Sequence, residues 1–474
     1  MGKTVDFFSS KWSSKLNTSP ERRKRNFVHS KSAITKIQAI LIIVIVVAAA
    51  AAGTYYYMMI TTPKEITLTV MVHWGDPVHQ ELYWEPIKEL YEKENPHIKI
   101  EYIYVESGEQ HTKIATMHAA GNLPDIHQIS SGWLPDDVEH SLWDEPPKEI
   151  QDFVREEFWP AAVELSSYKG VIWGVPAEMT IQALQYNKDI LAEAGYTEPP
   201  KTWSEMIKVA KAVTKYDAEG KIVRAGWQFY FPTPAYLWHY FRVFLLSNGG
   251  KMIERDSEGN PVRAVFNSTE GVEVLTEFVK CIYDYKITST ELTPSEDYPM
   301  ERIAMFLQGN WMMMVIKTRA SEEAMARYPW RASMPPYFKK PATCVHGYTW
   351  VVADQCKHKE EAWKFVKWLF TEHPNDPWKG TPMGDFLAWW GLFPSKKSDW
   401  EVYDEIKNDP YMSTFVDLIP YAQPLSLYLP YGSAEFYTSL VSELENAIYQ
   451  KKTPKQALDD AAAKWNEIIR EYYG

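Results

Sequence analysis

The longest uncharged run of the chain lies near its amino terminus. Residues 39–60 read AILIIVIVVAAAAAGTYYYMMI and contain no charged side chain. A helix of about 20 residues rises about 30 Å, which matches the hydrocarbon core of a bilayer. A core helix of a soluble protein would show a polar face over such a length. The run therefore predicts a transmembrane helix over 39–60.

Positive charge is concentrated before this run. Residues 1–38 contain nine Lys and Arg side chains, opposed only by Asp6 and Glu21. Because positive charge favours the cytoplasmic side, residues 1–38 are predicted to be cytoplasmic and the chain beyond residue 60 to lie outside. Residues 61–65 would form a short tether. The prediction is a single-pass membrane protein with a large extracytoplasmic part.

The same region is compatible with three fates of the amino terminus. Small residues at Ala48–Ala52 could serve signal peptidase, which would release the protein. Residues 31–35 (KSAIT) resemble an archaeal class III, type IV pilin-like signal peptide, in which cleavage before the hydrophobic segment leaves that segment on the mature chain. The third possibility is an uncleaved signal anchor.

Beyond residue 65, short β-branched runs alternate with amphipathic segments. Ile66–Val72 and Ile98–Val105 have strand-like patterns, and Pro86–Glu94 between them has helical spacing. A further helix is predicted at Thr112–Ala120, followed by a third short strand that starts near Ile126. This alternation predicts an α/β domain with a mainly parallel sheet.

The rest of the chain continues this mixture, and its length after residue 65 favours two domains rather than one. Thr202 and Glu205 form a capping-box pattern at the start of a helix. Further strands are predicted at Ile181–Asn187, Gly226–Phe231, Trp311–Ile316 and Tyr348–Val352, and further helices at Met206–Thr214, Tyr236–Leu246, Val272–Tyr285, Lys359–Phe370, Phe436–Gln450 and Pro454–Tyr472.

Composition narrows the class of ligand. The net charge is −12, with 50 Lys and Arg against 62 Asp and Glu, which argues against nucleic acid or anionic lipid. The 20 Trp and 29 Tyr residues favour a flat and partly apolar ligand, such as a sugar ring.

The cysteines and the search for catalytic motifs give little further evidence about function. At least one of Cys281, Cys344 and Cys356 is unpaired in a monomer, and a disulfide between Cys344 and Cys356 is possible outside the cell. Their spacing fits no common zinc pattern, so no metal or cofactor is expected. The sequence contains no Gly-x-Ser-x-Gly, His-Glu-x-x-His or phosphate-binding glycine motif. We therefore expect no enzymatic activity.

Several segments, taken in order, resemble the family 1 extracellular solute-binding proteins. These are the sugar receptors of ABC importers related to maltose-binding protein, here of an archaeal, membrane-anchored type. The longest matching segment is Tyr168–Met206, which includes YKGVIWGVPAEMTIQALQYNKDI, and Phe306–Trp311 (FLQGNW) is another. Gly347–Leu369 and the final TPKQALDDAAAKWNEII add to it. The resemblance runs from about residue 66 to residue 472.

The resemblance implies a fold and a mechanism. The fold is α/β and of the two-lobe, periplasmic-binding-protein-like type II, with three hinge crossings near Thr180–Gln185, Pro335–Gly347 and Gly391–Pro394. The lobes would be residues 66–182 plus 345–390 (N-terminal) and residues 183–344 plus 391–474 (C-terminal). A sugar or oligosaccharide would bind between the lobes, and the closed form would then dock on ABC permease subunits.

The resemblance also implies candidate ligand-binding residues, because such sheets bind ligands beyond the carboxyl ends of their strands. Trp311 would stack on a sugar face, and Asp76 would accept hydrogen bonds from hydroxyl groups. For each candidate the alternative is packing in the core or a loop, capping of a loop, or, as for Glu178 and the ring of Trp74, exposure to solvent. The full set is Trp74, Asp76, Ser131, Trp133, Glu178, Tyr230, Trp238, Trp311, Tyr348, Trp390 and Phe436.

Two other classes of protein remain open from the sequence. A membrane-anchored carbohydrate-active enzyme could hide its paired carboxylates among the many acidic residues. A pilin-like surface protein would use the apolar helix to form filaments and would bind no sugar.

Overall fold

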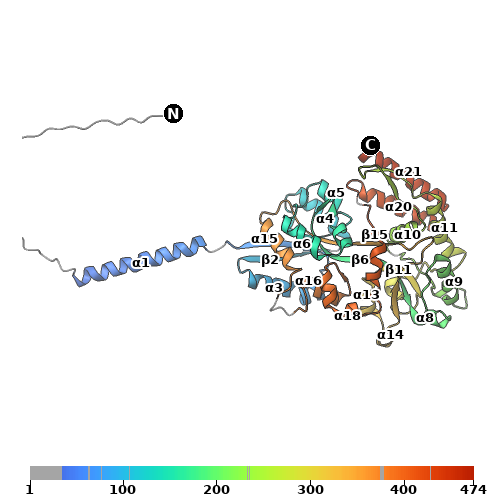
Figure 1. Ribbon diagram of the computed structural model, residues 1–474, viewed down its shortest axis with the longest axis horizontal. Coiled ribbons are helices and arrows are strands. Elements are labelled where there is room, and N and C mark those ends of the chain that lie inside the picture. The colour runs from blue at the N-terminus through green and yellow to red at the C-terminus, as the bar shows by residue number, and fades with distance from the viewer. Residues whose placement is uncertain are drawn as a thin grey trace, which may run out of the picture. The chain divides into compact units, whose positions relative to one another are not determined.

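The computed structural model describes most of the chain, drawn in Figure 1 as ribbon. The described residues are 35–61, 64–75, 77–105, 107–231, 233, 235–373, 378–427 and 429–474. The predicted cytoplasmic segment and signal motif, apart from residues 35–38, and Asp76 therefore lie outside them. The chain forms two compact units, residues 1–64 and 65–474.

The first unit contains one long apolar helix, α1 (Lys36–Thr61). It begins after Thr35, whose hydroxyl accepts from the Gln38 N–H while its own N–H donates to the Gln38 side chain at 3.0 Å. This reciprocal pair is a capping box, which satisfies donors that the first helical turn leaves free. By length and composition, residues 36–54 are sufficient to cross a membrane. The helix starts three residues before the predicted span and ends one residue after it.

The second unit is an α/β structure whose strands are short except at its centre. The strands described are β1 (Ile66–Val72), β2 (Ile98–Tyr104), β3 (Ile126–Ser130), β4 (Ser167–Tyr168), β5 (Val171–Ile172), β6 (Val175–Asn187), β7 (Lys215–Tyr216), β8 (Ile222–Arg224), β9 (Ile253–Arg255), β10 (Pro261–Ala264), β11 (Met305–Gly309), β12 (Trp330–Ser333), β13 (Thr343–Val352), β14 (Phe393–Pro394) and β15 (Ala422–Pro424).

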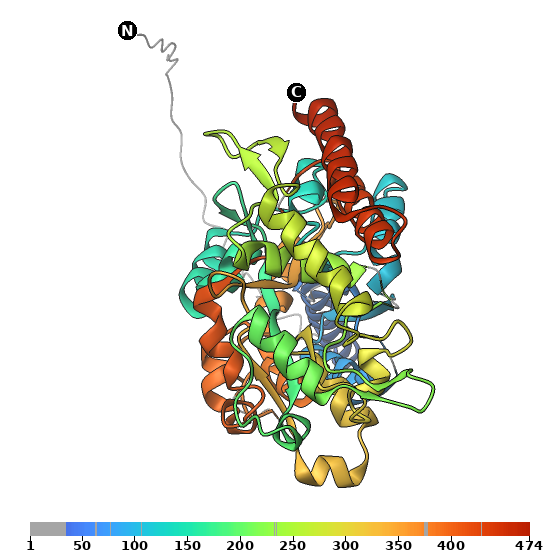
Figure 2. The ribbon, with the colours of Figure 1, turned by 90° about the vertical axis from the view of Figure 1, so that its right-hand side faces the viewer.

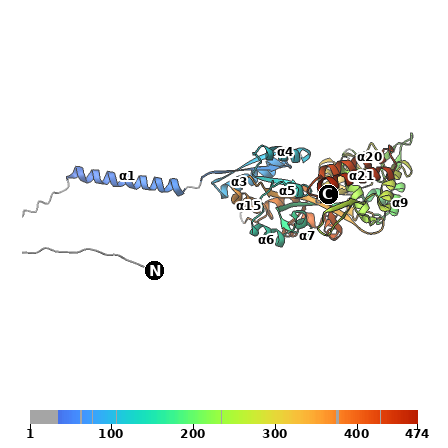
Figure 3. The ribbon, with the colours of Figure 1, turned by 90° about the horizontal axis from the view of Figure 1, so that it is seen from above.

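Helices surround these strands (Figures 2 and 3). They are α2 (Pro77–His79), the π-helix η1 (Gln80–Trp84), α3 (Glu85–Glu94), α4 (Ser107–Ala119), α5 (Leu134–Glu139), α6 (Lys148–Glu157), α7 (Pro160–Leu165), α8 (Lys188–Glu193), α9 (Trp203–Val213), α10 (Ala235–Ser247), α11 (Thr269–Tyr283), α12 (Pro294–Asp297), α13 (Met312–Arg319), α14 (Glu322–Arg327), α15 (Lys359–Trp368), α16 (Pro382–Trp390), α17 (Lys397–Val402), α18 (Asp404–Lys407), α19 (Thr414–Leu418), the 3₁₀ helix η2 (Ile419–Tyr421), α20 (Ser433–Ile448) and α21 (Pro454–Tyr473). Helices α20 and α21 lie side by side, as Figure 3 shows.

The first strands pair as the alternating pattern predicts. Strand β1 pairs in parallel with β2 along its whole length, from Ile66 opposite Ile98 to Val72 opposite Tyr104. It also pairs in parallel with β3 at Val70 and Met71. The carboxyl ends of these strands therefore meet at one edge, which is where the candidate loops lie.

One long strand joins the two halves of the unit. The main sheet runs in the order β11-β6-β13-β3-β1-β2, and β6 lies between β13 and β11. The first part of β6, from Val175 to Ile181, pairs antiparallel with β13, and its last part pairs with β11. Strand β14 pairs with β6 at Met179 and Glu178. Three segments, β6, β13 and β14, thus lie together where the predicted hinge crossings fall.

The buried apolar side chains form two core clusters. The first core draws on residues 68–177 and 350–392, and the second on residues 162–345 and 388–469. Among the described residues, Trp311 is the only half-buried hydrophobic side chain that packs against both cores. A side chain in that position contacts both halves of the unit.

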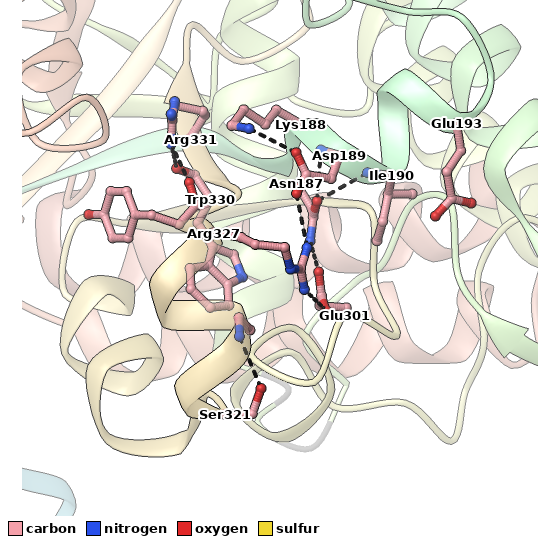
Figure 4. Close-up of polar contacts among 12 residues, drawn as sticks. Asn187, Lys188, Asp189, Ile190, Glu193, Glu301, Ser321, Arg327, Trp330 and Arg331 are labelled. Carbon is pink, nitrogen blue, oxygen red and sulfur yellow. Dashed lines mark hydrogen bonds and ion pairs between the residues drawn. The ribbon is translucent and has the colours of Figure 1, made fainter.

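A cluster of paired polar groups fixes the end of β6 in the second half (Figure 4). The Asn187 side chain caps α8, accepting from the N–H groups of Asp189 (3.0 Å) and Ile190 (3.1 Å). Arg327 donates to Asp189 at 2.9 Å and to Glu301 at 2.6 Å. Its two carboxylate partners tie α14 to α8 and to the loop before β11.

Two predicted strands are wrong. Residues 312–316 belong to helix α13, with Trp311 as its N-cap residue, and the strand is β11, which ends at Gly309. Periodicity does not separate strand from helix in a short apolar run that is buried nearly all round. Residues 226–231 are all described and form no strand. Only isolated bridges occur there, one at Gln228 and one at the preceding Ala225. The Gln228 side chain instead donates to the carbonyls of nearby loops.

The cysteines form no disulfide. Cys281, Cys344 and Cys356 are all free and buried. Cys344 packs in the second core and Cys356 in the first, so close spacing in the sequence does not bring the two together. The capping box of Thr202 and Glu205 is confirmed at the start of α9.

Candidate functional site

A cavity of about 530 Å³ lies where the ends of β1 and β2 face the second half of the unit. Its walls come from both core clusters and from the central strands β6 and β13. The lining residues are His73, Trp74, Gly75, His79, Tyr104, Val105, Lys113, Glu178, Thr180, Tyr236, Trp311, Met314, His346, Tyr348, Trp390 and Leu392.

One wall of the cavity is aromatic and belongs to the first half. The ring of His73 stacks on that of Tyr348, with 3.8 Å between centroids and 20° between planes. Trp74 lies beside both, at 4.6 Å from His73 and 6.1 Å from Tyr348. Its carbonyl accepts from the indole N–H of Trp84 at 2.6 Å. This bond holds the loop after β1 against the buried Trp84, so the aromatic wall is preformed.

The opposite wall is built by the second half. Trp311 follows directly after the Gly309-Asn310 corner at the end of β11, and its ring lies 6.2 Å from that of Tyr236 at 29°. Tyr236, on α10, is in turn supported by Tyr230, whose ring is 4.5 Å away. The buried side chain of Asn310 accepts from the N–H of Ile181 at 3.0 Å. The corner is thereby fixed to β6, and the cavity lies between flat apolar faces.

Glu178 is the one carboxylate among the described lining residues, and it is nearly inaccessible. It is 3% exposed, and its carboxyl accepts from the Thr180 hydroxyl at 3.1 Å. Burial raises the pKa of Glu178 to about 8, an effect that the Thr180 hydrogen bond only partly offsets. At neutral pH the group is therefore mostly a neutral carboxylic acid, which can donate as well as accept a hydrogen bond.

Two imidazoles of the cavity are also neutral. Burial lowers the pKa of His73 to about 3 and that of His346 to about 4. The Nδ1 atoms of both rings are buried without a hydrogen-bond partner. The charged Lys113 is exposed and already pairs with Glu109 at 2.8 Å. The cavity thus offers apolar faces and uncharged polar groups, a combination that suits a neutral, hydroxyl-rich ligand.

Five of the eleven sequence-predicted residues line this cavity: Trp74, Glu178, Trp311, Tyr348 and Trp390. Trp390, at the end of α16, meets the ring of His79 edge-on at 3.9 Å. Asp76 lies outside the described residues, although its neighbour Gly75 lines the cavity.

The remaining five predicted residues lie elsewhere. Ser131 is buried and makes two hydrogen bonds with Gly347. Its N–H donates to the Gly347 carbonyl at 2.9 Å, and its hydroxyl accepts from the Gly347 N–H at 3.3 Å. Trp133 stacks on His111, with ring centroids 4.6 Å apart. The other three side chains are buried in the second core: Tyr230, Trp238 and Phe436. A direct ligand role for these five residues stays a prediction that the lining of the cavity does not favour.

Sequence reasoning missed seven polar or aromatic lining residues: His73, His79, Tyr104, Lys113, Thr180, Tyr236 and His346. His73 directly precedes the predicted Trp74, and Thr180 follows Glu178 by two positions on the same strand. His346 precedes Tyr348 by the same spacing, so strand alternation could have placed both on one face. Tyr236 begins the helix whose Trp238 was selected instead, and neighbouring helical positions point in different directions.

The described ranges contain no group of three or more His, Cys, Asp or Glu side chains placed to hold a metal ion.

Residues 76–374 match the family of bacterial extracellular solute-binding proteins. The chain belongs to this family. Its relatives include a protein of Brucella abortus named as a binding protein, 24% identical over 402 residues, which cover 82% of this chain and 90% of the relative. The maltotriose-binding protein of Pyrococcus abyssi is 24% identical over 283 residues, covering 58% of this chain and 56% of that protein.

Solved structures share the fold of this family member. The maltose-bound MalE3 of T. maritima has a TM-score of 0.70 at 20% identity, covering 85% of this chain and 99% of that one. A solute-binding protein of Thermotoga lettingae bound to α-D-tagatose has a TM-score of 0.69 at 21% identity, covering 85% and 100%. These likenesses confirm the predicted two-lobe, type II periplasmic-binding-protein-like fold.

Proposed function

We propose that this solute-binding protein is the receptor of an ABC sugar importer. It takes a sugar or oligosaccharide into the cavity between the two cores and delivers it to permease subunits in the membrane. The single observation that carries this proposal is the position of Trp311. Its half-buried ring packs against both cores and faces the cavity.

The chemistry of the cavity supports a saccharide. Aromatic rings offer apolar area to the C–H faces of a sugar at low entropic cost. The neutral Glu178 and the Nδ1 atoms of His73 and His346, which have no partner, supply hydrogen bonds without an uncompensated charge. The proteins with similar sequence or fold are named for maltotriose or arabino-oligosaccharide binding, or are bound to maltose or tagatose.

The proposed binding set follows from the lining of the cavity. It consists of Trp74, Glu178, Trp311, Tyr348 and Trp390 from the sequence prediction, joined by His73, Thr180, Tyr236 and His346. In this account none of them acts on a bond of the ligand, and the protein is a receptor rather than an enzyme.

The proposed mechanism is closure of two lobes around the ligand. The lobes are residues 66–182 plus 345–390 and residues 183–344 plus 391–474, connected through β6, β13 and the segment that contains β14. A ligand that touches both lobes only when they are closed stabilises the closed state by its extra contacts. Permease subunits would then recognise the closed form.

The proposed location is the outer face of the cell membrane, with α1 as a single-pass anchor. Supporting this, residues 36–54 are long and apolar enough to span a bilayer, and the family is extracellular. Retention of the helix would keep the receptor near its permease.

A thermal-shift screen tests the function. The full chain, kept in mild detergent, is heated with single mono- and oligosaccharides, including maltotriose, arabino-oligosaccharide and tagatose. Because a ligand that binds only the folded state stabilises it by RT ln(1 + [L]/Kd), a true ligand raises the melting temperature in a dose-dependent way. Chromatography of the same mixtures reports turnover. A shift without new reducing ends supports a receptor, whereas new reducing ends or no shift with any saccharide contradicts it.

A further inference from the structure

A second cavity, of about 600 Å³, shares no lining residue with the first. It is bounded by the carboxyl-terminal part of α10, by β9, by the loop after β15 and by the segment around β4. Its most basic members are Arg242 on α10 and Arg255 at the end of β9. The two halves of the unit both contribute to it.

Arg242 has no hydrogen-bond or ion-pair partner among the described residues. Its side chain is half-buried, and its Nε atom is buried without a partner. Burial lowers the pKa of the guanidinium group, and no carboxylate opposes this effect. Arginine nonetheless stays charged in proteins. An unpaired charge in such a place is costly, so its retention calls for an explanation.

Arg255 is also without a carboxylate partner in the described part of the chain. Its guanidinium donates only to two backbone carbonyls, those of Gly259 and Leu427, both at 2.5 Å. Its pKa is lowered first by burial and further by the charge of the nearby Arg242, while Tyr473 and Asp256 offset part of this effect. The two arginines are thus close enough for their charges to repel each other.

The other charged side chains of the cavity do not neutralise the positive charge of the two arginines. Lys169 is already paired with Glu139 at 2.6 Å. Glu164 and Glu258 also line the cavity, yet neither is within ion-pair distance of an arginine. Two guanidinium groups without acidic partners, facing a cavity of ligand size, form a recognition pattern for oxyanions. Arginine binds carboxylate and phosphate groups through parallel hydrogen bonds.

We propose that this second cavity binds the carboxylate or phosphate group of an anionic small molecule through Arg242 and Arg255. This site is separate from the first cavity, where Glu178, His73 and His346 are neutral and Lys113 is paired with Glu109, and it goes beyond the proposed saccharide receptor function. The protein would then recognise two chemically different groups at two places.

The test uses the full chain in detergent, at constant ionic strength and with sodium chloride as the reference salt. Inorganic phosphate, glucose 6-phosphate and D-galacturonate are titrated separately while the melting temperature is recorded. We expect at least one of them to raise the melting temperature of the wild type beyond the effect of chloride. Arg242→Met should weaken that response at least about tenfold in Kd, the loss of one charge-assisted contact.

Matched variants keep the result interpretable. Arg263→Met removes an exposed arginine of β10 that pairs with Glu254 and lines neither cavity, so its anion response should equal that of the wild type. Without anions, Arg242→Met should melt at or above the wild-type temperature, since it removes an unpaired charge. If Arg242→Met does not fold, Arg255→Met at the rim of the cavity serves in its place.

The outcomes separate the sources of the anion. A response to phosphate and glucose 6-phosphate alone assigns a phosphate group, and a response to galacturonate alone assigns a carboxylate. No response to any of the three, or an unchanged response in both arginine variants, overturns the proposal. Neutral saccharide binding, measured on the same samples, reports on the first cavity independently.

Discussion

The rings of Trp311 and Tyr236 lie 6.2 Å apart, with 29° between their planes, although the two residues belong to different helical segments of the second half. Together they form one wall of the first cavity, opposite the wall of Trp74 and Tyr348. The relationship places two aromatic rings and one phenolic hydroxyl on the same side of the cavity.

Tyr236 is expected to contribute through both its ring and its hydroxyl. Tyr236→Phe keeps the ring and should weaken binding of the saccharide by a few-fold, roughly the net value of one hydrogen bond. Tyr236→Ala removes the ring as well and should weaken binding at least about tenfold. Calorimetric titration of both variants measures the difference. Equal affinity of Tyr236→Ala and the wild type would remove this residue from the site.

Gly309 is expected to tolerate no side chain. A Cβ atom there would lie 2.2 Å from Cγ2 of Thr180 and 3.0 Å from Cδ1 of Trp311. Gly309→Ala should therefore force β11 away from β6 and displace Trp311, lowering the free energy of unfolding by about 1–3 kcal/mol. Saccharide affinity should fall in the same variant.

Gly132→Ala is the control for this substitution, because its new Cβ would lie 3.4 Å from Ser426 and 3.8 Å from Oγ of Ser130. Both are ordinary van der Waals distances, so denaturant unfolding should show a much smaller change. Unfolding of Gly309→Ala at the same denaturant concentration as the wild type would contradict the close packing of Gly309 against Thr180 and Trp311.

Glu178 should make stability fall as pH rises. The folded protein holds the proton of Glu178 up to about pH 8, whereas a carboxyl with its ordinary pKa of 4.5 loses it earlier. Between these two pH values the folded state binds more protons than the unfolded state, so the stability contributed by this group decreases with increasing pH. Glu178→Gln removes the effect.

The measurement is the melting temperature of Glu178→Gln and of the wild type from pH 5 to pH 8. The difference should grow in favour of the variant by roughly 2 °C or more across this range. Glu109→Gln, which changes an exposed carboxylate on α4, should show a nearly constant difference. A flat profile for Glu178→Gln would mean that Glu178 is ionised in the folded protein.

The anchor has its own test. Expressed in its native host, the full chain should sediment with membranes and need detergent for release, because an uncharged helix of this length partitions into a bilayer. A variant that lacks residues 1–64 should remain in the soluble fraction. Sequencing of the mature amino terminus separates the routes: a start near Ala33 indicates pilin-like processing and Met1 an uncleaved anchor. A soluble protein that starts near residue 52 would contradict the anchor.

The sequence predicted the first half of the unit well. Strand β2 and helix α3 carry periodic patterns because each buries one face in the first core, whereas β1 and β3 show as short apolar runs that are buried over consecutive residues. The capping box at Thr202 is also visible, since it depends on two residues three positions apart. Such features are local, and local patterns need no knowledge of the partner element.

The candidate site was predicted only in part, for a physical reason. Aromatic residues line the cavity and also pack in the cores. Amino-acid composition does not show which of the two places each aromatic side chain occupies. Tyr236 lines the cavity whereas Trp238, on the same helix, is buried against Trp465. Strand β11 ends at Gly309 and helix α13 begins at Met312. The uniformly apolar run after Trp311 gives no sign of this change from strand to helix.

We propose above all that Trp311 stacks on a saccharide between the two cores. Calorimetric titration of wild type and Trp311→Ala with the best saccharide of the thermal screen tests it most directly. Tyr449→Ala, which truncates an exposed ring that lines neither cavity, is the control. We predict one site per chain and at least about a tenfold loss of affinity in Trp311→Ala alone, the value of one good stacking contact. Unchanged affinity in a folded Trp311→Ala would contradict the account.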